Sequence, residues 1–354
     1  MSPAPLSTQE TNMPNEIPAR RPGARNLGQA ENHDSLKARL NRLRDGDTIS
    51  VRVKRFDPSK DAEAYFESFT VPYAKWMRVL DVLIYLSDEI ESDLSYRWYC
   101  GSKMCGTCAM RVNGREVLAC WEAAEPDMSI EPLRNLPVVR DLSVDRRPYE
   151  QLVASLNPWL ERGSPYPGFP EALTHKEMRF ASKALDCISC AACYSACPVV
   201  GLGDVTGFAG PAPLVQLAQR ALDPRDTMDR AEVLIDRASI FSCISCYRCE
   251  EVCPSNIPIV SGVIEPLKAL AYKRHPEKIA HSSVFMRIIE KRGRIDPTEL
   301  VLRIQGVRAL YGLRRAFRLF LGGKINPIRT LFGRPVQGIG HIRRMFRFFN
   351  REKS

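Results

Sequence analysis

The order of hydrophobic and polar residues predicts a small mixed sheet domain in the first half of the chain. The stretches TISVRVKRFD (48–57) and YFESFTVPY (65–73) alternate apolar and polar residues with a period of two, which is typical of strands. The next stretch, MRVLDVLIYLSDEI, predicts a helix with one apolar stripe, formed by Val79, Leu80, Leu83, Leu86 and Ile90. AMRVNGREVLA (109–119) indicates two short strands around Asn113-Gly114, a strong two-residue hairpin signal. This hairpin should fold residue 119 back opposite residue 108.

The second half of the chain predicts helices. APLVQLAQRAL (212–222), AEVLIDRASIF (231–241) and IVSGVIEPLKALAYK (259–273) have helical spacing, and we expect Pro266 to kink the last of them. VDRRPYEQL (144–152) is interpreted as a linker, and residues 1–46, without hydrophobic periodicity, as disordered. The predicted divisions are a disordered tail (1–46), a mixed domain (47–147), a helical domain (148–300) and a C-terminal extension (301–354).

Composition narrows the class of protein. With 354 residues and 44% hydrophobic content the chain is globular, with no run of eighteen apolar residues. The first forty residues lack the apolar segment of a signal peptide, so we expect the reducing cytoplasm. Cysteines there are more often metal ligands or catalysts than disulfides.

All twelve cysteines fall into three patterned groups of four. The groups are Cys100, Cys105, Cys108, Cys120; Cys187, Cys190, Cys193, Cys197; and Cys243, Cys246, Cys249, Cys253. Disulfides do not explain why every spacing is short and repeated, whereas metal binding does.

The second and third groups are near copies, CISCAACYSACP (187–198) and CISCYRCEEVCP (243–254). Zinc is the alternative, but it needs only two Cys-x2-Cys pairs, whereas a third cysteine and a fourth before proline form the two-cluster ferredoxin run. In such ferredoxins the fourth cysteine of each run binds the cluster of the other run. We therefore assign Cys187, Cys190, Cys193 and Cys253 to one [4Fe–4S] cluster. The other site takes Cys243, Cys246, Cys249 and Cys197, and it holds a second [4Fe–4S] cluster, or a [3Fe–4S] cluster if Cys246 is not a ligand.

The first group has the four-then-two spacing of plant-type [2Fe–2S] ferredoxins, in CGSKMCGTC (100–108). The hairpin should bring Cys120 close to Cys108. Gly101 and Gly106 should let the loop backbone approach the inorganic sulfides. The expected fold class is α+β: a plant-type [2Fe–2S] ferredoxin (β-grasp) domain followed by an all-α domain like a two-cluster ferredoxin.

This organisation resembles the iron–sulfur subunit of succinate dehydrogenase and fumarate reductase over roughly residues 48–280. The similar segments are VLDVLIYL, CGTCAMRVNG, CISCAACYSACP and GPAPLVQLAQRALDPRDT. The resemblance implies a relay between a separate FAD-containing flavoprotein subunit and a membrane-side subunit, with the [2Fe–2S] centre facing the flavin. This chain shows no nucleophile with a recognisable base, so catalysis belongs to the complex and not to this chain alone.

The chain departs from the usual family pattern around the third site. The common form lacks the second cysteine of the last run, where this chain has Cys246, and it has a histidine where this chain has Ile244. VVGLGDV after the first run lacks the aromatic residues of the usual quinone pocket. From Cys243 onward, including GKINPIRTLFGRP, the chain resembles the iron–sulfur subunit of heterodisulfide reductase.

That second resemblance implies a non-classical succinate or fumarate enzyme whose membrane-side subunit is a membrane anchor or a cysteine-rich, heterodisulfide-reductase-like protein. The alternative is the iron–sulfur subunit of another flavin-linked dehydrogenase or of a heterodisulfide-reductase-like complex.

Positive charge is concentrated in residues 301–354. They hold thirteen Lys or Arg and one acid, Glu352, for a net charge of +12, whereas the whole chain carries +10. LRRAFRLFLGGK and IRRMFRFFNREK mix arginines with apolar residues at helical spacing. This pattern predicts either a solvated face that covers a partner or an interfacial helix on an anionic membrane, on the inner face of the cell membrane. Without a recognised binding motif elsewhere in the chain, nucleic acid is not an expected partner.

Overall fold

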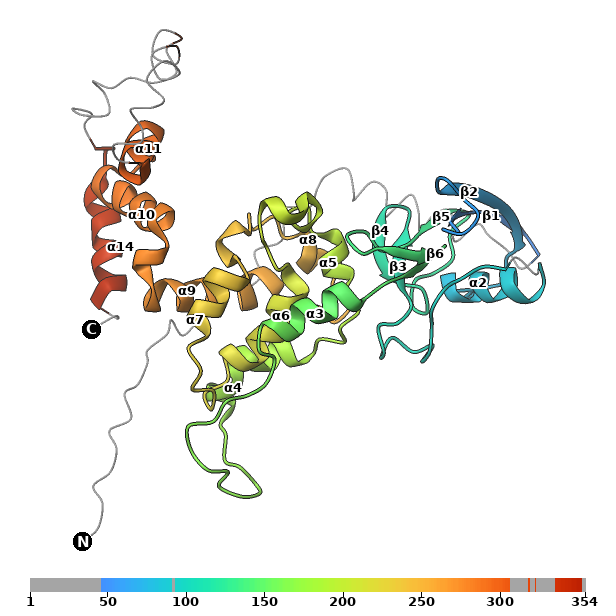
Figure 1. Ribbon diagram of the computed structural model, residues 1–354, viewed down its shortest axis with the longest axis horizontal. Coiled ribbons are helices and arrows are strands. Elements are labelled where there is room, and N and C mark those ends of the chain that lie inside the picture. Colours follow the sequence, from blue (N-terminus) through green and yellow to red (C-terminus); the bar gives the residue numbers. More distant parts are fainter. Residues whose placement is uncertain (1–45, 91–92, 306–317, 319–321, 323–334, 352–354) are drawn as a thin grey trace. The chain divides into compact units, whose positions relative to one another are not determined.

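The structure is a computed structural model that describes residues 46–90, 93–305, 318, 322 and 335–351 (Figure 1). These residues belong to two compact units, which meet in the sequence between Ala271 and Tyr272. The predicted tail, residues 1–46, lies outside the described residues except for Gly46. The predicted divisions at residues 147 and 300 stay predictions.

The first unit begins with a five-stranded sheet in the order β2-β1-β5-β3-β4. β1 pairs with β2 antiparallel and with β5 parallel, and the apolar residues of β1 alternate inward as predicted. The strands are β1 (Thr48–Arg55), β2 (Tyr65–Pro72), β3 (Ala109–Val112), β4 (Arg115–Leu118) and β5 (Asp127–Glu131). Helix α2 (Val79–Asp88) packs on this sheet with its predicted stripe, and the shared core includes Val51, Leu83 and Leu86, none of them exposed. Ile90 was predicted on that stripe, but the helix ends before it and its side chain is 39% exposed.

The hairpin prediction is confirmed in its register. Ala109 pairs with Leu118, and the Ala119 N–H donates to the Cys108 carbonyl at 3.1 Å. Asn113 and Gly114 both have positive φ, 50° and 79°, as a type I′ turn requires. Strand β5, which joins the hairpin to β1, was not predicted from the sequence, and neither was the short pair β6 (Val138–Arg140) and β7 (Ser143–Val144).

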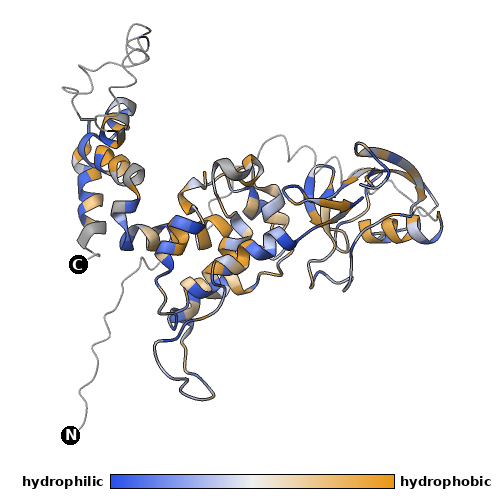
Figure 2. Ribbon diagram, in the orientation of Figure 1, coloured by the Kyte–Doolittle hydropathy of each residue, from blue (hydrophilic) through white to orange (hydrophobic). Residues whose placement is uncertain are grey.

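The rest of the first unit is helical around α6 (Pro211–Ala221), and hydrophobic residues, orange in Figure 2, are spread along its helices. Leu214, Leu217 and Ala218 of α6 are fully buried. The predicted linker is instead largely helix α3 (Arg147–Ser155), with Pro148 in its first turn, where the missing N–H costs no bond. The other elements are α4 (His175–Leu185), α5 (Ala192–Ala196), η1 (Val200–Val205), α7 (Arg230–Glu232), η2 (Val233–Arg237), η3 (Ile240–Ser242), α8 (Arg248–Glu251), η4 (Ile259–Ile264) and α9 (Glu265–Arg274).

Helix α4 was not predicted from the sequence, although it begins with a capping box between Thr174 and Glu177. The kink predicted at Pro266 stays a prediction, and the structure shows a change of helix type there, because the π-helical η4 gives way to α9 one residue before this proline.

Buried polar contacts join the sheet to the helices. The Ser195 hydroxyl on α5 donates to Glu116 of β4 at 2.9 Å and accepts from the Arg134 N–H at 2.8 Å. Asn135 donates to the carbonyls of Tyr194, Ser195 and Cys197, which closes the C-terminal end of α5. The two halves of this unit therefore share a fixed boundary next to the cysteines.

The second unit contains η5 (Pro276–Lys278), α10 (Ala280–Arg292), α11 (Pro297–Gln305) and α14 (Ile339–Arg351). A buried ion pair between Arg292 and Glu299 (2.8 Å) links α10 to α11, and Arg343 of α14 donates to the Lys291 carbonyl at 3.1 Å. Within the described residues, no helix has the length and apolar content that a membrane span needs.

Candidate metal centres

The first group of cysteines gathers in the loop between α2 and β3. Cys100, Cys105 and Cys108 lie on this loop, and the hairpin returns Cys120 beside Cys108. Burial raises the pKa of the Cys108 thiol to about 12, and the neighbouring Cys120 and Cys105 add to that rise. Buried thiolates this close together need a positive partner. The prediction that the hairpin brings Cys120 to Cys108 is confirmed.

Backbone N–H groups in this loop point at sulfur. Those of Ser102, Met104 and Cys105 lie 3.3–3.4 Å from the Cys100 sulfur, and that of Lys103 lies 3.4 Å from the Cys120 sulfur. These hydrogen bonds lower the pKa of the Cys100 thiol to about 6. The loop is therefore arranged to stabilise thiolates, the form of cysteine that binds metal.

The two cysteine runs fold as a structural repeat. Ser189 and Ser245, two residues after the first cysteine of each run, have positive φ of 54° and 52°. Ala191 and Tyr247, which precede α5 and α8, have φ of 63° and 64°. Such left-handed backbone costs about 1–3 kcal/mol per residue when glycine is absent, and it clusters at functional sites. The sequence repeat thus specifies a shared, strained loop geometry.

The fourth cysteine of each run lies with the other run. One cavity is lined by Cys187, Cys190, Cys193 and Cys253. A second is lined by Cys243, Cys246, Cys249 and Cys197. The structure therefore brings together the same two sets of four that the ferredoxin spacing predicted.

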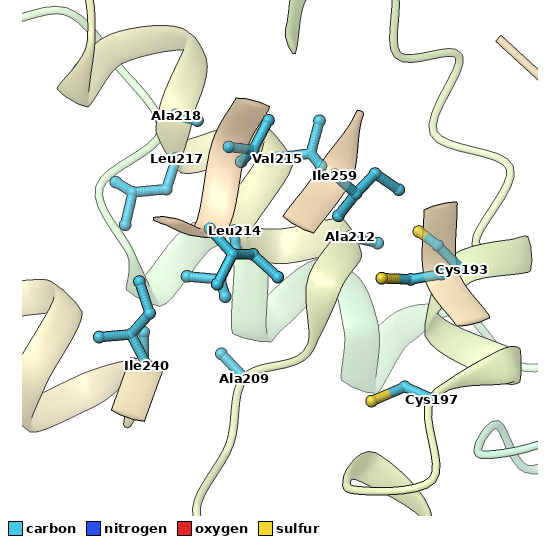
Figure 3. Close-up of a cluster of buried hydrophobic side chains, with 14 of the residues drawn as sticks. Cys193, Cys197, Ala209, Ala212, Leu214, Val215, Leu217, Ala218, Ile240 and Ile259 are labelled. Carbon is cyan, nitrogen blue, oxygen red and sulfur yellow. The ribbon is translucent and has the colours of Figure 1, made fainter. Parts of the chain in front are cut away.

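These cavities sit at the edge of the helical core. Figure 3 shows Cys193 and Cys197 reaching toward the buried side chains of α6 and its neighbours. Burial raises the pKa of the Cys193 thiol well above its usual range and that of Cys190 to about 11. Burial also raises the pKa of Cys197 and Cys249 in the second cavity.

The donor set fits iron–sulfur clusters. All twelve cysteines are free thiols. Within the described ranges, no three His, Cys, Asp or Glu side chains are arranged to hold a single metal ion. In a [4Fe–4S] cluster each thiolate binds a different iron atom, and in a [2Fe–2S] cluster each iron binds two thiolates. In both, the four ligands surround a volume rather than converge on a point. The two cavities and the N–H-lined loop have this form.

Three polar residues beside the cysteines were missed from the sequence. Gln216 of α6 donates to the Cys187 sulfur (3.4 Å) and the Ser189 hydroxyl (2.9 Å). Arg146 donates to the Ser189 carbonyl at 2.6 Å, and Lys268 to the Cys243 carbonyl at 2.9 Å. The available signal for Gln216 was a polar residue flanked by buried Val215 and Leu217 within an apolar helix.

Two family models match the chain. A "2Fe-2S iron-sulfur cluster binding domain" matches residues 50–151, and a "4Fe-4S dicluster domain" matches residues 183–257. The predicted [2Fe–2S] and [4Fe–4S] cofactors and the predicted α+β fold class are thereby confirmed.

Curated relatives have the same pattern. Over 238 residues the chain is 33% identical to the fumarate reductase iron–sulfur subunit of Mycobacterium tuberculosis, covering 64% of this chain and 93% of that protein. Over 246 residues it is 32% identical to a fumarate reductase (CoM/CoB) subunit of Methanothermobacter marburgensis, covering 70% of this chain. The chain spans about half the length of that methanogen protein, 49%.

A solved structure extends the similarity to the fold. A chain of the Mycobacterium smegmatis Sdh1 complex in the apo form matches with a TM-score of 0.60 and 27% sequence identity, over 65% of this chain and 98% of that chain. Together with the cysteine geometry, these matches show that the chain belongs to the family of iron–sulfur subunits of fumarate reductase and succinate dehydrogenase.

Proposed function

We propose that the chain is the electron-transfer subunit of a succinate dehydrogenase or fumarate reductase complex. It relays electrons between the FAD of a flavoprotein subunit and a membrane-side quinone-linked or cysteine-rich subunit. The observation that carries the proposal is the placement of three sets of four cysteines in one compact unit. When bound, each cluster accepts and releases electrons at a potential that its surroundings set.

The proposed ligands follow the three sets. Cys100, Cys105, Cys108 and Cys120 hold the [2Fe–2S] cluster; Cys187, Cys190, Cys193 and Cys253 hold a [4Fe–4S] cluster; and Cys243, Cys246, Cys249 and Cys197 hold the third. We propose [4Fe–4S] for the third as well, because Cys246 lines the same cavity as the other three. A [3Fe–4S] centre is the alternative if Cys246 is not a ligand.

Exposed aromatic residues around the first site support docking of the flavoprotein there. Trp98 (46% exposed) and Tyr99 (82%) precede Cys100, Met104 (71%) precedes Cys105, and Trp121 (53%) follows Cys120. The Lys103 ammonium lies 5.2 Å from the centre of the Trp121 ring. Aromatic and Met side chains are enriched in protein interfaces. A patch that surrounds the cysteine loop suits a partner whose redox group must come close to it.

A second exposed apolar patch surrounds the third site. Ile244 (66% exposed) follows Cys243, Tyr247 (41%) follows Cys246, and Leu202 (62%) lies on η1, after Cys197. We place the membrane-side partner on this patch. The first and third sites thus each have an apolar docking surface, while the second site, with Cys190 and Cys193 buried, lies inside the unit.

Helix α14 supports attachment to an anionic membrane surface. Its Met345 and Phe348 are about 60% exposed, and Arg343, Arg344 and Arg347 lie beside them on the helix. Exposed apolar side chains flanked by arginines are typical of interfacial helices. We therefore place the chain peripherally on the cytoplasmic face of the cell membrane.

Anaerobic purification of the complex tests the main proposal. The protein should be brown, carry about ten iron and ten sulfide atoms per chain, and co-purify with an FAD-containing subunit that oxidises succinate or reduces fumarate. Colourless protein with zinc and no sulfide would reject it. If a different flavin-linked dehydrogenase co-purified, the alternative function would replace it.

Vesicle binding tests the membrane attachment. The complex should sediment with vesicles that contain anionic lipid, and both 0.5 M salt (about 4 Å of screening length) and Phe348→Ser with Met345→Ser should reduce the sedimented fraction. Recovery that is unchanged both in 0.5 M salt and in the double variant would reject the attachment through α14. The matched control is Leu302→Ser, an exposed apolar residue on α11 outside this surface.

A further inference from the structure

We propose that Gly106 is a positioning residue for electron transfer between the first and second cysteine sites. The absence of a side chain at this residue lets the two cysteine loops touch. The inference rests on the proposed function, because it concerns the distance between two proposed clusters.

Gly106 packs directly against the second site. A Cβ atom built on Gly106 would lie 2.8 Å from the Cys190 Cβ, 2.9 Å from the Cys190 Cα and 2.9 Å from the Ile188 carbonyl oxygen. Carbon atoms normally pack at about 3.5–4.0 Å. The three atoms belong to backbone or to a Cβ, so they cannot turn away as the end of a long side chain can. Any side chain at this position therefore has to push the two loops apart.

The contact joins two proposed ligands of different clusters. Gly106 follows Cys105 in the chain, and it touches Cys190 itself. Only one peptide link and one van der Waals contact then separate the Cys105 residue from Cys190. Electron tunnelling falls exponentially with distance and falls faster across a gap than through bonds, so this contact should dominate the coupling.

Beside this contact, the loop of Cys105 and the loop of Cys190 are separated by a cavity. A cavity of about 240 Å³ is lined by Cys105 and Cys190 together with Arg97 and Arg146. The close approach therefore depends on Gly106. Arg146 also donates to the Ser189 carbonyl at 2.6 Å, which fixes the loop that Gly106 meets.

Gly101 gives a matched control in the same loop. Its φ is +64° against +70° for Gly106, so alanine is strained to a similar degree at both positions. A Cβ on Gly101 meets no atom within 4 Å, whereas a Cβ on Gly106 meets the second site. The difference between the two alanine variants therefore isolates the contact from the backbone strain.

The test compares Gly106→Ala and Gly101→Ala in the full-length complex, purified anaerobically. After flash reduction of the [2Fe–2S] cluster, transfer to the neighbouring centre should be a few-fold slower in Gly106→Ala than in Gly101→Ala. Electron paramagnetic resonance should show weaker relaxation enhancement of the [2Fe–2S] signal by the neighbouring reduced centre in Gly106→Ala than in Gly101→Ala. Iron content should match between the two variants, so that slower transfer is not a loss of cluster.

Equal transfer rates and equal relaxation enhancement in the two variants would overturn the inference. If Gly106→Ala does not assemble both clusters, the coupling between the two centres is measured in the wild-type complex instead. Its [2Fe–2S] signal should relax faster once the neighbouring centre is reduced, and no change would overturn the inference. An absence of [2Fe–2S] and [4Fe–4S] signals from the wild type would reject the proposed function instead.

Discussion

The two cysteine repeats have the same spacing and the same backbone turns, yet they lie in different surroundings. Cys190, second in the first run, is 7% exposed, whereas its counterpart Cys246 is exposed. Ala191 in the first run is 1% exposed, and the matching Tyr247 is 41% exposed. The motif determines local geometry, while the elements packed around it determine solvent access. One repeat can thus supply an internal centre and a surface centre.

The difference is confined to one corner of the second cavity. Cys249 and Cys197 are as buried as Cys193 and Cys190, and burial raises the pKa of all four thiols. Only the side at Cys246 is open, next to the exposed Ile244. Since solvent exposure is one of the factors that set cluster potentials, the two sites should differ in potential and in reactivity even with identical ligands.

The largest expected effect is a loss of stability on substitution of Cys190, in the first run. Cys190→Ala keeps the Cβ that meets Gly106 but removes one buried proposed ligand from its cavity. The three remaining thiolates, of which Cys193 is buried and Cys187 and Cys253 are half-buried, would lack full compensation, at a cost of about 3 kcal/mol of unfolding free energy. The melting temperature should fall by roughly 6–12 °C. Calorimetry and the loss of one [4Fe–4S] signal would check this. A stable variant with the signal intact contradicts the assignment.

The second largest expected effect is a difference in the rate at which the two cubane-type sites of the wild type lose iron to a chelator. A chelator reaches the open corner at Cys246 without local unfolding, whereas the site at Cys190 needs an opening motion. We expect the third cluster to lose iron at least about ten-fold faster, the ratio that 1.4 kcal/mol of protection gives. Time-resolved electron paramagnetic resonance of each signal would measure it. Loss of both signals at one rate would remove the functional distinction between the repeats.

The matched substitution Cys246→Ala should be milder than Cys190→Ala. Cys246 is exposed, so water can occupy the space that its side chain leaves. The unfolding free energy should therefore change by less than about 1 kcal/mol, as at other surface positions. The third centre should then lose one iron and give a three-iron signal in the oxidised protein, near one per chain. If the wild type already gives that signal, the third centre is [3Fe–4S] and Cys246 is not a ligand.

Much of this geometry could be predicted from the sequence, because local patterns specify it. The hairpin at Asn113-Gly114 and the crossing of Cys197 and Cys253 follow from turn chemistry and spacing. The exposure difference between Cys190 and Cys246 could not be predicted, because it depends on which distant segments cover each run. The same holds for β5, whose residues pair with residues of β1 that lie 77 positions earlier in the sequence.

Gln216 is another feature that required the structure, since its partners lie 27 and 29 residues earlier in the chain. Gln216 also distinguishes the two cysteine cavities from each other. Among the described residues, the hydrogen bonds to cysteine sulfur at the site of Cys187 include this side-chain donor, whereas those at the third site come from the backbone N–H groups of Val199 and Val200 to Cys197. An N–H donor stabilises the more negative, reduced state of a cluster, so it should raise the potential of the first-run site alone.

The smallest expected effect follows from removing this donor. Gln216→Leu should lower the potential of the buried [4Fe–4S] cluster by roughly 20–40 mV, which corresponds to 0.5–1 kcal/mol for one hydrogen bond and one electron. Gln219→Leu is the control, because Gln219 lies on the same helix but donates to the Ala184 carbonyl at 2.8 Å. Redox titration followed by electron paramagnetic resonance would resolve the centres. An equal shift in both variants, or a shift of the third centre, would mean that Gln216 acts through helix packing and not through the Cys187 sulfur.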